Sequence, residues 1–235
     1  MTNKYNNKLF SVLGDSISTL DGYTEPEGMA YYEGAAKFSA DVFFPEDTWW
    51  GAVIERLGAK LLVNNSISGS MVIKHQKCEL PTYGCSDERT SALDKEGLSP
   101  DVIMVLLGTN DWGCGARLVP NGPSQENDLA VFSIAYRAML EKLTANYPYA
   151  EIWCMTLPVG RWSANEFYSF RYCYAGTHID EYCEIIREMA KSFGCRLIDL
   201  YHGDERHDTI DGFHPNKSGM MTLADSVIRM LENDN

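Results

Sequence analysis

The sequence predicts an α/β protein in which a five-stranded parallel sheet lies between two layers of helices. Short strand-like apolar runs alternate with segments of helical periodicity along most of the chain, which is typical of a parallel sheet covered on both faces. The run 102–107 is apolar at every position, as expected of a central strand that is buried on both faces.

The five segments predicted as strands are short, apolar and bounded by turn-forming residues. Gly14 follows the first and Pro158 follows the fourth, and neither residue readily continues a strand. The segments cover residues 9–13, 60–64, 102–107, 151–156 and 196–200. Right-handed crossovers between them predict a doubly wound, flavodoxin-like three-layer α/β/α sandwich. In such a sheet, ligands bind beyond the carboxyl ends of the strands.

Four longer segments have the periodicity of helices. Either Asp47 or Thr48 can serve as the N-cap of the first, and Pro148 closes the second. In the second, apolar residues recur three or four positions apart, at Leu129, Phe132, Tyr136, Leu140 and Leu143. The predicted helices cover residues 48–57, 126–147, 179–192 and 217–231.

The length of 235 residues suits a single domain, 1–235, with a sizeable core. No internal repeat or linker divides the chain. Three segments, near 19–47, 74–97 and 156–177, do not fit the strand–helix alternation and are interpreted as loop insertions. Loops of that length in a compact domain usually serve function or are mobile.

The formal net charge of −13 argues against nucleic acid and anionic membranes as partners, because both would be repelled. No apolar stretch approaches the ~18 residues of a membrane-spanning helix, and no signal peptide is recognised. We therefore expect a cytoplasmic protein. The charge does not indicate the substrate, and the motifs described below lead us to expect a small-molecule or carbohydrate ester. No motif indicates the oligomeric state.

The seven cysteines are odd in number and lack the regular spacing of a disulfide framework. We expect free thiols, which is consistent with the cytoplasm. His75, Cys78 and Cys85 lie close in sequence, but no second half with zinc-ligand spacing follows. No metal site is predicted.

Two polar motifs at strand ends supply a candidate nucleophile and base. Ser16 follows the first strand and Gly14, which permits a tight turn that exposes the serine. Asp211 and His214 lie three residues apart before the last helix, where the carboxylate can accept the imidazole N–H and fix its tautomer. Each motif alone is also compatible with an ordinary turn.

Two further motifs offer candidate oxyanion donors. Gly69 lies in the loop after the second strand, where its backbone can approach a ligand closely. Asn110 follows the central strand in Gly108-Thr109-Asn110-Asp111 and carries an amide donor. A nucleophile, a base, an orienting acid and oxyanion donors on one sheet edge together indicate acyl transfer.

These motifs resemble those of the SGNH hydrolases, also called the GDSL family. The four blocks appear in order as Gly14-Asp15-Ser16, Gly69, Gly108-x-Asn110-Asp111 and Asp211-x-x-His214. Two departures are Ile17 in place of the leucine of the family's name, and a second block in which serines flank Gly69.

The resemblance implies a flavodoxin-like fold and hydrolysis of esters or thioesters with no metal or organic cofactor. It implies Ser16 as the nucleophile, His214 as the general base and Asp211 as its partner. The implied oxyanion hole comprises the N–H groups of Ser16 and Gly69 and the side chain of Asn110.

The substrate is indicated only by the composition of the insertions, which are rich in aromatic residues. Most of these rings are expected to pack in the core, but aromatic faces beside a polar cleft also suit sugar rings. Asp15, Trp112 and Arg161 are candidate substrate contacts, and Arg171 and Glu166 add polar groups to the third insertion. We expect a short-chain, chiefly acetyl, esterase acting on a carbohydrate.

Other functions remain open at this point. The same fold could serve as a non-catalytic carbohydrate-binding module, or as a thioesterase or lysophospholipase-type acylhydrolase. A flavin or nucleotide binder would need a phosphate-binding loop after the first strand. Gly14-Asp15-Ser16 instead offers one glycine and a carboxylate that repels phosphate.

Overall fold

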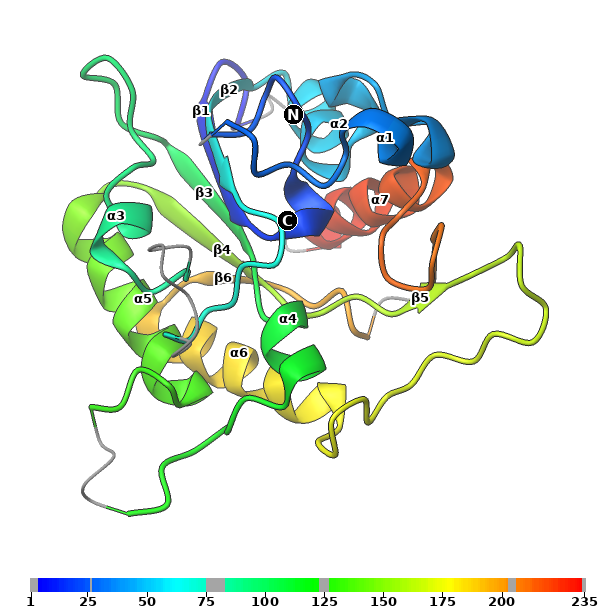
Figure 1. Ribbon diagram of the computed structural model, residues 1–235. Helices are drawn as coiled ribbons and strands as arrows, with labels where there is room; N and C mark the ends of the chain where they lie inside the picture. The colour runs from blue at the N-terminus through cyan, green and yellow to red at the C-terminus, as the bar shows by residue number, and fades with distance from the viewer. Residues whose placement is uncertain (1–3, 26, 75–82, 123–126, 203–205, 234–235) are drawn as a thin grey trace.

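The computed structural model describes residues 4–25, 27–74, 83–122, 127–202 and 206–233. Its central sheet has five parallel strands, in the order β2-β1-β3-β4-β6. They are β1 Leu9–Gly14, β2 Lys60–Ser66, β3 Val102–Leu106, β4 Glu151–Met155 and β6 Arg196–Ile198. Counted along the chain, this is the 2-1-3-4-5 order of flavodoxin-like sheets. The predicted fold class is therefore confirmed (Figure 1).

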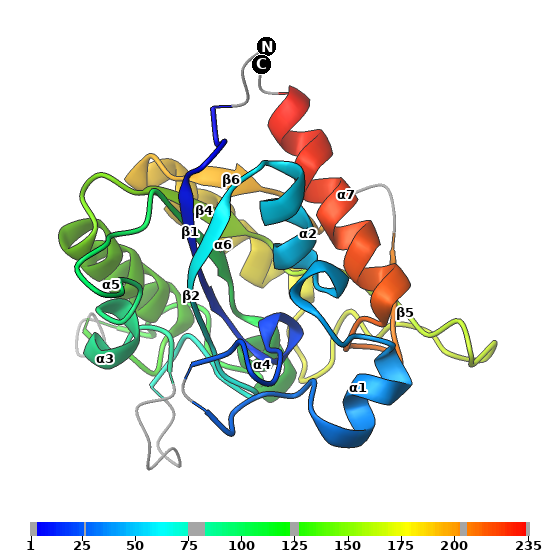
Figure 2. The same ribbon diagram turned by 90° about the horizontal axis from the view of Figure 1, so that it is seen from above.

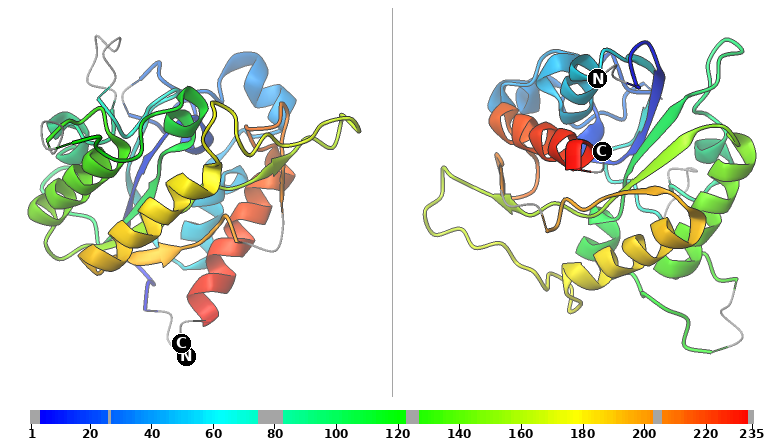
Figure 3. Two further views of the ribbon diagram at one scale, coloured as in Figure 1. Left: turned by 90° about the horizontal axis from the view of Figure 1, so that it is seen from below. Right: turned by 180° about the vertical axis from the view of Figure 1, so that it is seen from behind.

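Two pairs of long helices cover the two faces of the sheet (Figure 2). α5 Phe132–Asn146 and α6 Ile179–Phe193 lie on one face, and α2 Trp49–Arg56 and α7 Lys217–Asn233 lie on the other. Figure 3 shows the same layers from behind, with α7 in red and α6 in yellow on opposite sides of the strands.

β3 is buried at every position, as predicted for a central strand. Its side chains alternate between two apolar cores because successive residues of a strand point to opposite faces. Ile103 and Val105 belong to the core under α5 and α6, whereas Met104 and Leu106 belong to the core under α2 and α7. These two cores hold the carboxyl edge of the sheet in place.

The second predicted helix starts later than its periodicity indicates, at Phe132. The N–H groups of Phe132 and Ser133 donate to the carbonyls of Arg117 and Leu118 (2.8 and 3.0 Å). Asp128 turns the chain just before, accepting from Ala130 N at 2.9 Å. The preceding segment is therefore a loop, and predicted position 126 lies outside the described residues.

The last predicted strand ends two residues early, at Ile198. Asp199 accepts a hydrogen bond from Thr156 Oγ1 (2.8 Å), and that hydroxyl accepts from Tyr201 N (2.9 Å). Just after β6, these side-chain hydrogen bonds take the place of the backbone hydrogen bonds that pair neighbouring strands.

The insertions contain short elements that the sequence pattern does not predict. Within 19–47 the structure has α1 Gly34–Ala40 and the 3-10 helix η2 Pro45–Asp47. The described part of 74–97 contains α3 Asp87–Thr90, and 156–177 contributes β5 Gly160–Arg161, which pairs with β7 His207–Asp208. Such short elements depend on tertiary contacts rather than periodicity. In the described parts of the chain, no helix is long and apolar enough to cross a bilayer.

Candidate active site

The carboxyl edge of the sheet brings together side chains from three distant parts of the chain. Ser16 begins the 3-10 helix η1 Ser16–Ser18 directly after β1, and Asn110 lies in α4 Thr109–Cys114 after β3. His214 lies in the loop between β7 and α7. All three line one cavity of about 240 Å³. The edge is the one at which doubly wound sheets bind ligands.

Ser16, His214 and Asp211 form one hydrogen-bonded chain. His214 Nε2 lies 3.0 Å from Ser16 Oγ, and His214 Nδ1 lies 2.7 Å from Asp211 Oδ2. An ionised carboxylate only accepts, so Nδ1 carries the proton and Nε2 is left to accept from the serine hydroxyl. The arrangement can remove a proton from Ser16 as the hydroxyl attacks an acyl carbon.

The carboxylate of Asp211 also shapes the loop that carries the histidine. Its Oδ1 accepts from the backbone N–H groups of Phe213 and His214 at 2.9 and 2.8 Å. Burial works to raise the pKa of Asp211, but the hydrogen bonds from His214 and this backbone hold it well below its usual range. Asp211 therefore stays ionised and can stabilise a protonated His214.

Tyr31, from the first insertion, packs against this pair and is a residue that sequence reasoning gave no role. Its ring stacks on the imidazole of His214, with centroids 3.5 Å apart and planes 9° from parallel. Its hydroxyl donates to Asp211 Oδ2 at 3.2 Å. Burial, reinforced by Asp211, raises the pKa of Tyr31 to about 12, so the hydroxyl remains a donor. The stack and the hydrogen bond fix the plane of the histidine.

Close packing explains the glycine that precedes Ser16. A Cβ on Gly14 would lie 2.6 Å from Ser18 Cβ and 2.8 Å from Ser66 Oγ. The glycine is therefore needed for the approach of neighbouring chain segments and not for a positive φ, because Gly14 is absent from the glycines with φ > 0. This approach allows β1 to turn abruptly into η1.

Asp15 does not occupy the substrate-contact position that the sequence analysis expects. Its side chain is fully buried, and Oδ1 accepts from Ile17 N at 3.0 Å as the N-cap of η1. Oδ2 has no hydrogen-bond partner in the described part of the chain. Burial raises the pKa of Asp15 to about 7. Asp15 thus holds the turn that presents Ser16.

The start of α4 fastens the loop that follows β2. Asn110 Nδ2 donates to Ser70 O at 2.9 Å. The buried carboxylate of Asp111 accepts from Val72 N and Ile73 N at 2.8 and 3.1 Å. An amide nitrogen carries two N–H groups, so the bond to Ser70 leaves Asn110 one donor for an oxyanion.

Gly69 lies in the same loop but does not belong to the lining of the cavity. It has φ +76°, which favours glycine, and a Cβ there would meet nothing within 4 Å. The space around it is therefore open on the exposed side of the loop. Its oxyanion role remains a prediction.

The walls of the cavity are mostly aromatic and apolar. Trp112 is almost fully buried, stacks on Phe170 at 5.4 Å and donates from Nε1 to Tyr172 O at 3.2 Å. The lining residues are Ser16, Ile17, Thr109, Asn110, Trp112, Gly113, Cys114, Tyr174, Phe213 and His214. Trp112 is thus a rigid wall beside Ser16.

Arg161, the third predicted substrate contact, lies outside this lining. Its guanidinium holds the carboxylate of Asp208 with two hydrogen bonds, of 2.6 and 3.2 Å, between β5 and β7. The structure therefore gives Arg161 a protein partner beside the small sheet.

Replacement of Asn110 by alanine should lower kcat by about 10²–10³ with little change in KM. The amide is a donor that a tetrahedral oxyanion uses more strongly than the substrate carbonyl does. Steady-state kinetics with p-nitrophenyl acetate measure the effect, and Asn110→Asp is the matched variant that keeps the bulk of the side chain. If Asn110→Ala keeps the wild-type kcat, Asn110 does not belong to the oxyanion hole.

Arg89, in α3, is a second residue that sequence reasoning missed. Its side chain is 2% exposed. Nη2 donates to Gly14 O (3.0 Å) and Asn65 O (2.7 Å), Nη1 donates to Ser70 Oγ (2.7 Å), and Nε donates to Asn65 Oδ1. Burial lowers the pKa of Arg89 to about 9, which keeps the charge at neutral pH. The guanidinium ties the end of β1 to the loop after β2.

Arg89→Met should destabilise the fold by at least about 3 kcal/mol, because several buried acceptors lose their donor. For a chain of this size that is a fall in Tm of about 6–12 °C. Thermal unfolding followed by circular dichroism measures it. Arg137→Met removes an exposed arginine of α5 and should leave Tm unchanged. Equal Tm values in the two variants would contradict the role of Arg89.

Among the described residues, no group of three or more His, Cys, Asp and Glu side chains could hold a metal ion. His75 and Cys78 lie outside the described residues. Cys85 is buried, which raises the pKa of its thiol to about 12. A thiol with such a pKa is a poor metal ligand, because the thiolate is the form that binds.

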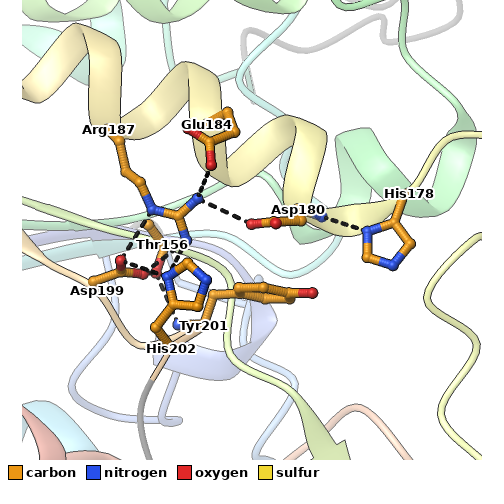
Figure 4. Close-up of polar contacts among 8 residues, drawn as sticks. All are labelled: Thr156, His178, Asp180, Glu184, Arg187, Asp199, Tyr201 and His202. Atoms are coloured by element: carbon orange, nitrogen blue, oxygen red, sulfur yellow. Dashed lines mark hydrogen bonds and ion pairs between the residues drawn. The ribbon is translucent and has the colours of Figure 1, made fainter.

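A second polar cluster, around Arg187 of α6, lies outside the lining of the cavity (Figure 4). The guanidinium donates to Asp199 Oδ2 (2.9 Å) and Oδ1 (3.0 Å), and to Asp180 and Glu184 (2.9 and 2.8 Å). His202 Nδ1 lies 3.0 Å from Asp199 Oδ2. The cluster fastens α6 to the segment that follows β6, which is a structural role for its histidine.

Known proteins resemble this chain in both sequence and fold. The family model of the GDSL-like lipases/acylhydrolases matches residues 8–158. A GDSL-like lipase from Bacteroides ovatus has a TM-score of 0.73 and 26% identity, covering 98% of this chain and 100% of its own. One from Bacteroides uniformis has a TM-score of 0.70 and 29% identity, covering 97% and 96%. No curated protein matches.

A third solved structure, an aryl esterase from M. smegmatis, has a TM-score of 0.62 at 14% identity and covers 96% of this chain and 99% of its own. That likeness shows the fold alone. The family model covers more than half of the chain, so this protein belongs to the GDSL-like lipase/acylhydrolase family. It is therefore a hydrolase, and the family supports activity on acyl groups.

Proposed function

We propose that this protein is a serine esterase that hydrolyses short-chain, chiefly acetyl, esters of carbohydrates through an acyl-enzyme on Ser16. The observation that carries the proposal is the hydrogen-bonded chain from Ser16 through His214 to Asp211, at 3.0 and 2.7 Å, at a cavity that Asn110 also lines. Nucleophile, base, orienting acid and oxyanion donor are the groups that acyl transfer requires.

In the acylation step, Ser16 Oγ forms a bond to the acyl carbon while His214 Nε2 takes the hydroxyl proton. The oxyanion accepts hydrogen bonds from Asn110, the Ser16 N–H and Gly69 N–H. The bond between the acyl carbon and the alcohol oxygen then breaks, and His214 returns its proton to that oxygen. Water attacks the acyl-enzyme in the same way, which releases the acid and restores Ser16.

The preference for short acyl groups follows from the size of the cavity. The cavity of about 240 Å³ is smaller than most ligand pockets, which measure roughly 300–1,000 Å³. A cavity of this size suits an acetyl group better than an octanoyl chain. The almost fully buried Trp112, stacked on Phe170, limits expansion of the wall.

We expect kcat/KM for p-nitrophenyl esters to fall at least about tenfold from acetate to octanoate, because forcing extra methylenes into a packed wall costs 1–3 kcal/mol. Butyrate should lie between them. Hydrolysis of the three esters by wild type and Ser16→Ala, side by side, tests both acyl preference and nucleophile. Octanoate turned over as fast as acetate would favour a lipase or lysophospholipase instead.

We also propose the cytoplasm as the location. The six cysteines in the described ranges are free, which suits a reducing compartment. Immunodetection in cell fractions tests this: the protein should be found in the cytosolic fraction, and recovery from the medium would contradict it.

A further inference from the structure

A second, larger cavity adjoins the catalytic one and is built by the third insertion, which extends away from the sheet after β5 (Figure 1). Its volume is about 570 Å³. Its lining residues are Asn165, Phe167, Tyr168, Ser169, Phe170, Arg171, Tyr174 and Phe213. We call this cavity the insertion groove. Tyr174 and Phe213 line both cavities, so the two cavities adjoin at these residues.

The insertion groove is held against the loop that carries the catalytic histidine. Tyr168 Oη donates to Gly212 O at 3.0 Å, two residues before His214. The rings of Tyr174 and Phe213 meet edge to face, with centroids 5.8 Å apart. The groove is therefore positioned relative to His214 by direct contacts.

The proton transfer from His214 to the leaving oxygen indicates that the groove binds the alcohol. In the proposed mechanism His214 gives its proton to the leaving oxygen, so the alcohol must lie on the His214 side of Ser16. Phe213 directly precedes His214 and forms the wall that both cavities share. An alcohol that extends past His214 consequently enters the insertion groove.

The side chains of the groove suit a sugar that carries negative charge. Phe167 is 88% exposed and Tyr174 is 48% exposed, which offers aromatic faces to a ring. Arg171 is the charged residue of the lining, and its guanidinium lies 6.0 Å from the centroid of Tyr174. Within the described ranges no carboxylate forms an ion pair with Arg171. A planar guanidinium recognises a carboxylate or phosphate through paired hydrogen bonds.

Resting on the proposed esterase function, we propose that the insertion groove binds the alcohol part of the ester and that Arg171 selects O-acylated sugars with an anionic group. The net charge of −13 repels anions in general. A local cation at the groove is thus needed for such a substrate to bind.

The test compares three acetyl esters of similar size: an O-acetylated methyl glucuronoside, the matching neutral methyl glucoside and an O-acetylated glucose phosphate. Wild type should show a kcat/KM at least about tenfold higher for an anionic ester than for the neutral one, as expected for hydrogen bonds to a charged group. The two anionic esters distinguish a carboxylate from a phosphate. Equal values for all three esters would overturn the proposal.

Arg171→Met should remove the preference for the anionic esters, whereas Arg137→Met, which removes an exposed charge on α5, should retain it. All three esters form the same acetyl-enzyme, so the change should occur in kcat/KM and not in the deacylation rate. Phe167→Ala should raise KM for charged and neutral sugar esters alike. An anion preference that survives in Arg171→Met would also overturn the proposal.

Hydrolysis of p-nitrophenyl acetate separates the two proposals, because its activated leaving group carries no anionic substituent for Arg171 to bind. Arg137→Met, the exposed-surface control, should hydrolyse it within about twofold of wild type. If wild type hydrolyses it and Ser16→Ala does not, but no anion preference is found, only the groove assignment fails. If wild type does not hydrolyse it, the proposed esterase function fails.

Discussion

Replacement of Ser16 by alanine should lower kcat by about 10⁶, the effect expected when the nucleophile of a catalytic triad is removed. Ser16 Oγ is the hydroxyl that lies 3.0 Å from His214 Nε2, and alanine offers no group that could form the acyl-enzyme. The remaining rate comes from the oxyanion donors and substrate binding alone. Hydrolysis of p-nitrophenyl acetate under single-turnover conditions measures the loss.

Ser91→Ala is the matched control for this experiment, because Ser91 is exposed and its hydroxyl only donates to Asp87 O at 2.8 Å. It should keep wild-type kcat. Both variants should unfold at the wild-type temperature, which separates loss of chemistry from loss of fold. A Ser16→Ala protein with more than about a hundredth of wild-type kcat would contradict Ser16 as the nucleophile.

Asp211→Asn should lower kcat by about 10⁴ while the protein remains folded. The asparagine oxygen can still accept from Phe213 N and His214 N, the two backbone bonds that shape the loop. Its amide nitrogen, however, donates where Oδ2 accepts from His214 Nδ1. The imidazole then adopts the other tautomer, with its proton on Nε2, and cannot accept from Ser16.

Comparison with Asp211→Ala separates the effect on the tautomer of His214 from the effect on the loop that carries His214. The alanine variant loses both backbone bonds as well, so it should show a lower Tm in addition to lost activity. Asp211→Asn keeps both backbone bonds, so it should unfold at a higher temperature than Asp211→Ala. A kcat within tenfold of wild type in Asp211→Asn would show that Asp211 does not set the tautomer.

The sequence predicted the fold well because its main features are local or periodic. The buried run at β3 and the strand–helix alternation give the sheet and its layers without knowledge of distant contacts. The spacing of Asp211 and His214 likewise permits a hydrogen bond within one loop, and the structure has it at 2.7 Å.

Features that depend on contacts between distant segments could not be predicted. Arg89 is a charged residue in an insertion, and no local pattern shows that its guanidinium reaches Gly14 and Asn65. Tyr31 is one of many aromatic residues in the insertions, and its stack on His214 appears only in the folded chain. The ion pair of Arg161 likewise joins distant parts of the chain, because its partner is Asp208, and its role as a substrate contact stays a prediction.

The predicted start of the helix over 126–147 was wrong for a related reason. The apolar periodicity of 126–147 begins before the helix does, because Leu129 packs on the same core from a loop. The start at Phe132 is set by hydrogen bonds to Arg117 and Leu118, which the periodicity does not encode.

The central claim is a covalent acyl-enzyme on Ser16, and rapid acid quenching during p-nitrophenyl acetate turnover, followed by peptide mass spectrometry, tests it most directly. The account predicts one acetyl group on the peptide that contains Ser16 in wild type, and none in Ser16→Ala. The exposed thiol of Cys114 also lines the cavity and is the alternative site of acylation. An acetyl group on Cys114 that persists in Ser16→Ala, with Ser16 unmodified in wild type, would contradict the account.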